Sequence, residues 1–123
     1  MKIIEAINQI DSLKPNTYSV KQKIYWLSQL EAMVKVQVID THEGGDRIPF
    51  DGFTEDTDTQ TQLFMPAPFD MAYIYWLEAQ IHYANEDIDM YNSAIMMFNT
   101  AFREFKDHYT KSHATKGTGR FRF

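Results

Sequence analysis

Four histidines and a run of acidic residues are the side chains with the greatest potential for chemistry, and neither set has the spacing of a known site. His42, His82, His108 and His113 include no pair four residues apart, the spacing that puts two metal ligands on one helix face. The acids between positions 46 and 58 lack the glycine and the closing glutamate of a calcium loop. The sequence has no cysteine, no glycine-rich phosphate loop and no nucleophile elbow. We therefore expect solvated histidines, a solvated and mobile acidic loop, no catalytic, metal or cofactor site, and a protein that is not an enzyme.

Length and composition favour one ordered domain. The chain has 123 residues, and its aromatic fraction of 15% is too high for a disordered segment. No apolar run approaches the roughly 18 residues of a membrane span. Glu5 interrupts the N-terminal apolar run, so no signal-peptide core is present. These features predict a soluble cytosolic protein with no membrane partner.

Charge is distributed unevenly along the chain. Residues 103–123 hold six basic and two acidic side chains, a net charge of +4, whereas residues 1–102 carry −9. A basic C-terminal segment on an acidic body suggests docking on an acidic surface, either a protein or a nucleic acid. The acidic body argues against a protein that coats DNA phosphates.

The longest periodic stretch predicts one long helix of about 69–110, or two nearly collinear helices over the same residues. Its apolar residues recur at alternating steps of three and four, which places them on one helix face, and it contains no glycine and no proline after position 68. At about 1.5 Å per residue such a helix would be about 60 Å long, more than a domain of this size can cover. We expect it either to bend, near Asn85 or at Asn92–Ser93, or to project into an assembly.

A second apolar column accompanies this face at seven-residue steps: Trp76, Tyr83, Met90 and Met97. Together the two make an apolar arc wider than one packing layer requires. One interpretation is a central helix wrapped by its own chain. The other, which we adopt as the functional hypothesis, is that the column packs on neighbouring subunits.

The N-terminal half predicts two shorter helices and a long connection. Apolar spacing predicts helices at about 2–13 and 20–41, the second capped by Ser19 with Gln22 three residues later. The β-branched run 34–39 could also form a strand, but we assign it to the second helix because the helical spacing continues through it. A loop follows over 43–68, and a connection of this length is commonly functional or disordered. The expected architecture is an all-α single domain, a small helical bundle over 1–113. The acidic side chains of the loop are Asp46, Asp51, Glu55, Asp56 and Asp58.

Residues 114–123 form a basic, aromatic tail. Gly117 and Gly119 disfavour helix, and the chain closes on Arg-Phe-Arg-Phe. The tail is either a frayed terminus or a docking segment whose rings fill pockets on a partner while its cations pair with carboxylates. The docking interpretation rests on Lys116, Arg120, Phe121, Arg122 and Phe123.

The sequence resembles the head–tail connector (adaptor, head-completion) proteins of tailed phages and prophages of Gram-positive bacteria. The similarity covers most of the chain and departs from the family between Gly44 and Gln62. The segments that carry it are Ile10–Tyr18 (IDSLKPNTY), Lys23–Glu31 (KIYWLSQLE), Pro66–Ile81 (PAPFDMAYIYWLEAQI), Tyr91–Asn99 (YNSAIMMFN) and Phe121–Phe123 (FRF).

This resemblance implies a structural virion protein of the neck, assembled in the cytoplasm of a bacterial host. Such subunits form a homo-oligomeric ring, commonly of twelve, that docks on the portal protein. The ring continues the channel for double-stranded DNA and receives the next tail-completion protein. The tail would bind the portal. Removing residues 114–123 should then abolish portal binding without disrupting the fold. The acidic loop would face the channel or reach the next ring.

Two alternatives remain open from the sequence: a non-viral helical protein–protein adaptor, and a weak nucleic-acid-binding module that uses the basic tail.

Overall fold

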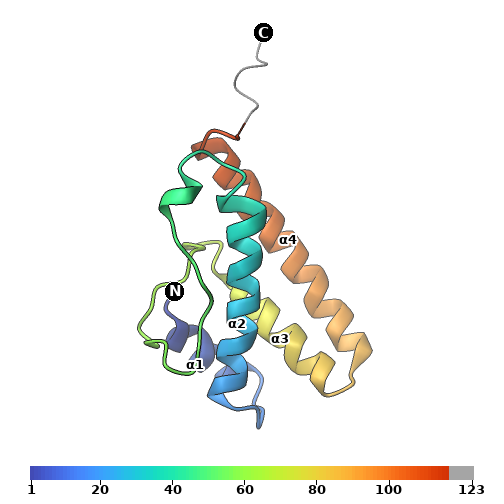
Figure 1. Ribbon diagram of the computed structural model, residues 1–123. Coiled ribbons are helices and arrows are strands. Elements are labelled where there is room, and N and C mark those ends of the chain that lie inside the picture. The colour runs from blue at the N-terminus through green and yellow to red at the C-terminus, as the bar shows by residue number, and fades with distance from the viewer. Residues whose placement is uncertain (117–123) are drawn as a thin grey trace.

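A computed structural model describes residues 1–116 and confirms a small all-α protein (Figure 1). Within those residues the backbone forms helices and turns, with two isolated β-bridges but no strand. The elements are α1 (Ile3–Leu13), α2 (Val20–Val34), the π-helical turn η1 (Lys35–Ile39), the 3₁₀ turn η2 (Gly45–Arg47), α3 (Met71–Ala84) and α4 (Ile88–Ser112).

The predicted helix of 69–110 is two helices that fold back on each other. The chain reverses at Asn85–Asp87, and α3 and α4 lie side by side as a hairpin (Figure 1). Glu86 adopts a left-handed conformation with φ 61°, and the Asp87 side chain accepts a hydrogen bond from Met90 N (3.2 Å), which starts α4. One of the two sites expected for a bend is therefore the turn, but the expectation of a single or collinear rod is wrong. The three-and-four spacing continues through the turn because both arms bury their apolar faces in the same core.

The second predicted helix is largely confirmed. Ser19 Oγ accepts a hydrogen bond from Gln22 N (3.0 Å) and caps α2 as the sequence predicted. The β-branched stretch after Val34 stays helical as η1 rather than forming a strand. Its last residues, Val38 and Ile39, are buried, so η1 extends the buried face of α2 to the loop.

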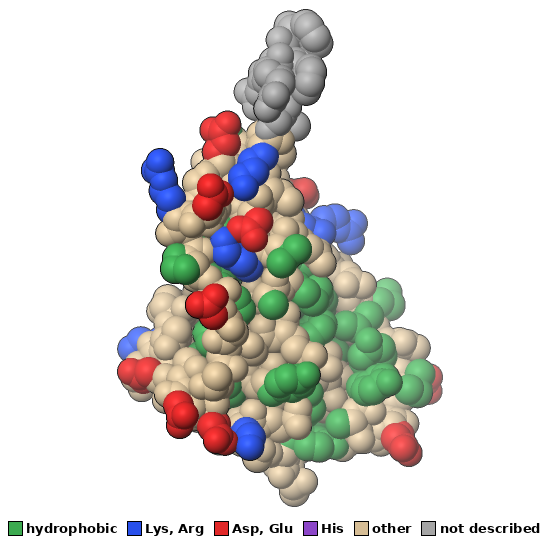
Figure 2. Space-filling model, viewed as in Figure 1, with side chains coloured by type: hydrophobic (Ala, Val, Ile, Leu, Met, Phe, Trp, Pro, Cys, Tyr) green, Lys and Arg blue, Asp and Glu red, His purple; other side chains and the backbone are tan. Residues whose placement is uncertain are grey.

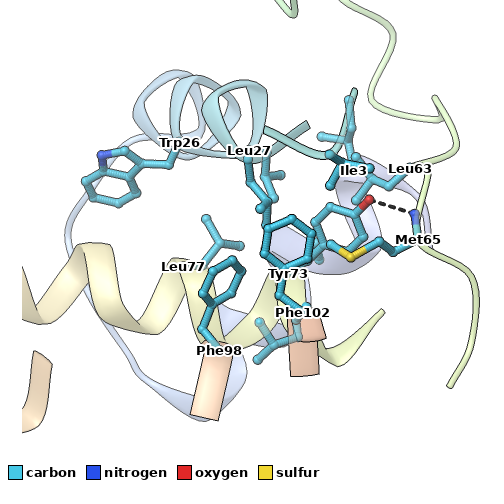
Figure 3. Close-up of a cluster of buried hydrophobic side chains, with 14 of the residues drawn as sticks. Ile3, Trp26, Leu27, Leu63, Met65, Tyr73, Leu77, Phe98 and Phe102 are labelled. Carbon is cyan, nitrogen blue, oxygen red and sulfur yellow. Dashed lines mark hydrogen bonds between the residues drawn. The ribbon is translucent and has the colours of Figure 1, made fainter. Parts of the chain in front are cut away.

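One hydrophobic core joins all four α-helices (Figure 3). Leu27 of α2 and Leu77 of α3 are fully buried, and Phe98 and Phe102 of α4 close the core from the hairpin side. Trp76 Nε1 donates a hydrogen bond to Trp26 O (2.8 Å). The hairpin is thus fixed to α2 by packing and by a directional contact.

The connection between η1 and α3 is anchored along α1 and α2 rather than free. Ile3 N donates to Thr61 O (3.0 Å), and Ile4 N donates to Thr59 O (2.9 Å). Phe53 N donates to Ser28 Oγ (2.9 Å). The loop backbone therefore has a fixed path, while its acidic side chains remain at the surface.

Gly45 is expected to be the most sensitive glycine. A Cβ there would lie 2.3 Å from Ile39 O, a backbone atom that cannot yield as a flexible side chain does. We expect Gly45→Ala to lower the free energy of unfolding in urea by about 3 kcal/mol. Gly44→Ala is the matched control, because a Cβ there meets nothing within 4 Å and suffers only from φ +86°, at a cost of about 1 kcal/mol. Equal losses for the two variants would contradict this packing.

Candidate interaction surfaces

An open groove of about 540 Å³ lies where α2 faces the α3–α4 hairpin. Its walls are aromatic rings, a thioether and two amides, and no charged side chain lines it. The ring centroids of Tyr83 and Tyr91, on opposite arms of the hairpin, are 5.4 Å apart. We call this feature the α2–α3 groove; its lining residues are Gln29, Met33, Trp76, Gln80, Tyr83 and Tyr91.

The four residues predicted to form one interface column are divided between two helices. Trp76 and Tyr83 lie on α3 and line the groove, whereas Met90 and Met97 lie on α4. Trp76 is half-buried, and its ring centroid lies 5.1 Å from that of Phe98, so it is largely a core residue. The prediction that these four residues form a single column on one helix is wrong, because the chain reverses between Tyr83 and Met90. Contact of these residues with another subunit stays a prediction.

Apolar side chains nevertheless gather on the hairpin side of the molecule, to the right in Figure 2. Tyr83 is 62% exposed, Met97 51% and Met90 40%. Ile88 continues the three-and-four apolar spacing that predicted a buried helix face, yet it is 55% exposed, because it lies just after the reversal. Met96, at 69%, was not singled out from the sequence. Exposed apolar clusters of this kind mark sites of protein–protein contact.

The acidic side chains of the loop are dispersed over the surface rather than gathered at one point. Glu55 pairs with Lys21 at 3.1 Å, and Asp58 Oδ1 accepts a hydrogen bond from Gln60 N (2.9 Å). Asp51 and Asp56 are exposed. No single site is built from these carboxylates, so what they offer a partner is a diffuse negative field.

The start of the C-terminal tail is held against the end of η1. Glu43 N donates to Ala114 O (2.7 Å), and Lys116 N donates to Thr41 O (2.9 Å). Lys116 Nζ lies 3.2 Å from Asp46 Oδ1, and this hydrogen bond lowers the pKa of the Asp46 carboxyl. The other predicted docking residues, Arg120, Phe121, Arg122 and Phe123, lie outside the described residues.

A buried carboxylate that was not predicted from the sequence lies at the centre of the fold. Glu31 of α2 is 1% exposed. It accepts hydrogen bonds from Phe64 N (2.9 Å) and from the Tyr73 hydroxyl, which itself accepts one from Met65 N (2.8 Å). The last of these contacts is drawn in Figure 3. Burial raises the pKa of Glu31 from 4.5 to about 7, although the hydrogen bonds from Tyr73 and Phe64 oppose the shift. Burial, with the Glu31 charge beside it, also raises the pKa of Tyr73 well above 10.0.

This network joins three segments that are distant in the sequence, namely α2, α3 and the end of the loop. The available sequence signal was the position of Glu31, four residues after Leu27 and three before Val34, on the apolar face of α2. Its partners could not be found that way, because they lie 33 and 42 residues away.

Two histidines depart from the expected solvation. The side chain of His82 is only 13% exposed, with Nε2 3.5 Å from Glu78 Oε1, and His42 is more deeply buried. His42 is 4% exposed, with Nδ1 2.6 Å from Val38 O and Nε2 3.2 Å from Thr110 Oγ1. The expectation of a solvated side chain is wrong here, because His42 closes the contact between η1 and the end of α4. His113 stacks on Tyr109 with ring centroids 3.8 Å apart. In residues 1–116 no group of three or more potential ligands is arranged to hold a metal ion.

Comparisons with known proteins give this arrangement no relative. No protein-family model matches the sequence, and no curated protein or solved structure resembles it at a significant level. Over residues 1–116, none of the helices is both long and apolar enough to cross a membrane.

Proposed function

We propose that this protein is a structural subunit of a phage neck, a head–tail connector that forms a ring on the portal and continues the DNA channel. The observation that carries the proposal is the exposed apolar surface of the α3–α4 hairpin. Tyr83, Ile88, Met90 and Met97 expose 40% or more of their surface on one hairpin. Burial of such a surface between copies would stabilise a ring.

The parts of the subunit have separate roles in this proposal. The bundle of α1–α4 is the body, and Met90 and Met97 contact neighbouring copies. The tail docks on the portal through Lys116, Arg120, Phe121, Arg122 and Phe123. The acidic loop faces the channel or the next tail-completion protein. The protein acts without a cofactor, without catalysis and without sequence-specific DNA contact, and it resides in the virion neck after assembly in the host cytoplasm.

A channel-facing loop would repel DNA phosphates and let the duplex slide. Neutralising Asp51, Glu55, Asp56 and Asp58 to the matching amides should therefore impair DNA retention or ejection. We expect a drop of about tenfold in infectious particles per DNA-filled head, because four charges are removed from one subunit and the change repeats around the ring. The measurement is a plaque assay paired with packaged-DNA quantification. The control is Glu104→Gln with Asp107→Asn on α4, both exposed and outside the loop. An unchanged ratio in the loop variant would reject this role.

Light scattering of the chain alone and with isolated portal rings tests the function itself. A connector adds a stoichiometric set of copies to the portal. A non-viral adaptor remains a monomer or dimer and does not bind the portal rings. A nucleic-acid-binding module instead binds duplex DNA with an affinity that falls steeply with salt.

A further inference from the structure

The α2–α3 groove ends at an acidic turn. Tyr83 and Tyr91 form this end, and they flank the reversal between α3 and α4. From residue 79 to residue 102 the sequence contains no Lys or Arg. The turn and the first residues of α4 instead carry three exposed acids: Glu86, Asp87 and Asp89.

The C-terminal residues have the complementary chemistry. After Asp107 the sequence contains no acidic residue. Its last four residues, 120–123, alternate two guanidinium groups with two phenyl rings. Phenyl rings suit an aromatic, uncharged groove, and guanidinium groups suit an acidic rim.

A tail cannot reach the acidic end of the groove in its own molecule. It starts from Lys116, whose N–H is bound to Thr41 O at 2.9 Å beside the C-terminal end of α4. Along α4, Tyr91 and Ser112 are separated by about 32 Å at 1.5 Å per residue. The seven residues after Lys116 span at most about 25 Å when fully extended. The occupant with matching chemistry is therefore the tail of a second copy.

We propose that, in the free protein, residues 120–123 of one copy occupy the α2–α3 groove of another. The rings of Phe121 and Phe123 contact Tyr83 and Tyr91, and the two arginines face the acidic turn. This contact is heterologous, because a tail meets a groove, so each copy both donates and accepts. Such contacts close into rings or extend as chains.

Sedimentation of the full chain over a range of concentrations tests the proposal. We expect self-association in the wild-type chain that is weakened about tenfold or more by Phe121→Ser with Phe123→Ser, and equally by Tyr83→Ser. Tyr83 is 62% exposed, so Tyr83→Ser should keep the fold, which circular dichroism verifies. The matched control is Val36→Ser, which removes an apolar side chain that is 64% exposed outside the groove and should leave self-association unchanged.

A synthetic peptide of residues 117–123 supplies the second measurement. It should compete with self-association of the wild-type chain, and a peptide with serine in place of both phenylalanines should not. A chain that is monomeric at every concentration and does not bind the peptide would overturn the proposal. Self-association that survives either the tail or the groove variant would overturn it as well.

This contact goes beyond the proposed connector function and does not depend on the portal. A wild-type chain that the peptide of residues 117–123 dissociates, and that also binds portal rings, would support both the groove contact and the connector function. A chain that fails to bind portal rings while its tail still fills the groove would reject only the connector function.

Discussion

A chain that ends at Lys116 is expected to bind the portal about 100-fold more weakly than the full chain. The reason is the composition of the seven residues removed, which include two arginines and two phenylalanines, residue types that are enriched at the cores of protein interfaces. Its free energy of unfolding should stay within about 0.5 kcal/mol of the wild type, because every residue of the core is retained. Surface plasmon resonance on immobilised portal rings, with urea unfolding alongside, gives both quantities.

The cut is placed after Lys116 because the preceding residues belong to the fold. Ala114 and Lys116 make backbone hydrogen bonds with Glu43 and Thr41. A chain ending at His113 loses both and should be destabilised by about 2 kcal/mol, which would confuse loss of docking with loss of structure. The matched control is Lys111→Ala with Arg103→Ala, which removes two exposed cations from α4 but keeps the tail. Portal binding by the chain ending at Lys116 with wild-type affinity would contradict the docking role.

The stability of the protein is expected to fall as pH rises from about 4.5 to about 7, and Glu31 is the cause. Its pKa is about 7 in the folded state against 4.5 for the ordinary side chain. Between these values the folded protein holds a proton that the unfolded chain has lost, so each rise in pH favours unfolding. At 1.36 kcal/mol per pKa unit the contribution of Glu31 is fully present below pH 4.5 and has declined by about 3 kcal/mol above pH 7.

Glu31→Gln isolates this contribution, since an amide does not titrate. Urea unfolding at steps from pH 4.5 to pH 8 should show that the free energy of unfolding depends less on pH for Glu31→Gln than for the wild type. The stability of the variant relative to the wild type should be highest above pH 7. The control Glu104→Gln removes an exposed carboxyl and should run parallel to the wild type. Parallel curves for Glu31→Gln and the wild type would show that Glu31 is ionised with an ordinary pKa.

Local signals in the sequence were sufficient for the N-terminal helices α1 and α2. The Ser19 cap and the apolar spacing placed α2, and the same spacing kept η1 helical despite its β-branched residues. These features depend on residues within a few positions of one another, so they can be read from the sequence without knowing the fold.

The reversal between α3 and α4 could not be found from periodicity. Only three residues separate the helices, so the apolar steps continue across the turn from Ile81 through Ala84 and Ile88 to Tyr91. What marks the turn is the polar run Asn85–Asp87, in which Glu86 takes a left-handed conformation. A solvated stretch of a continuous helix can have the same composition.

The interaction surfaces follow from that reversal and were correspondingly harder to predict. Tyr83 and Tyr91 meet only because the hairpin brings opposite arms together. The partners of Glu31 come from the loop and from α3. In each case a long-range contact, rather than a local pattern, decides which side chains share a site.

Electron microscopy of the chain mixed with its portal tests the connector function most directly. We expect an added ring, coaxial with the portal, built from copies of this chain around an open channel. Portal rings that remain bare at saturating concentrations of the folded chain would contradict it.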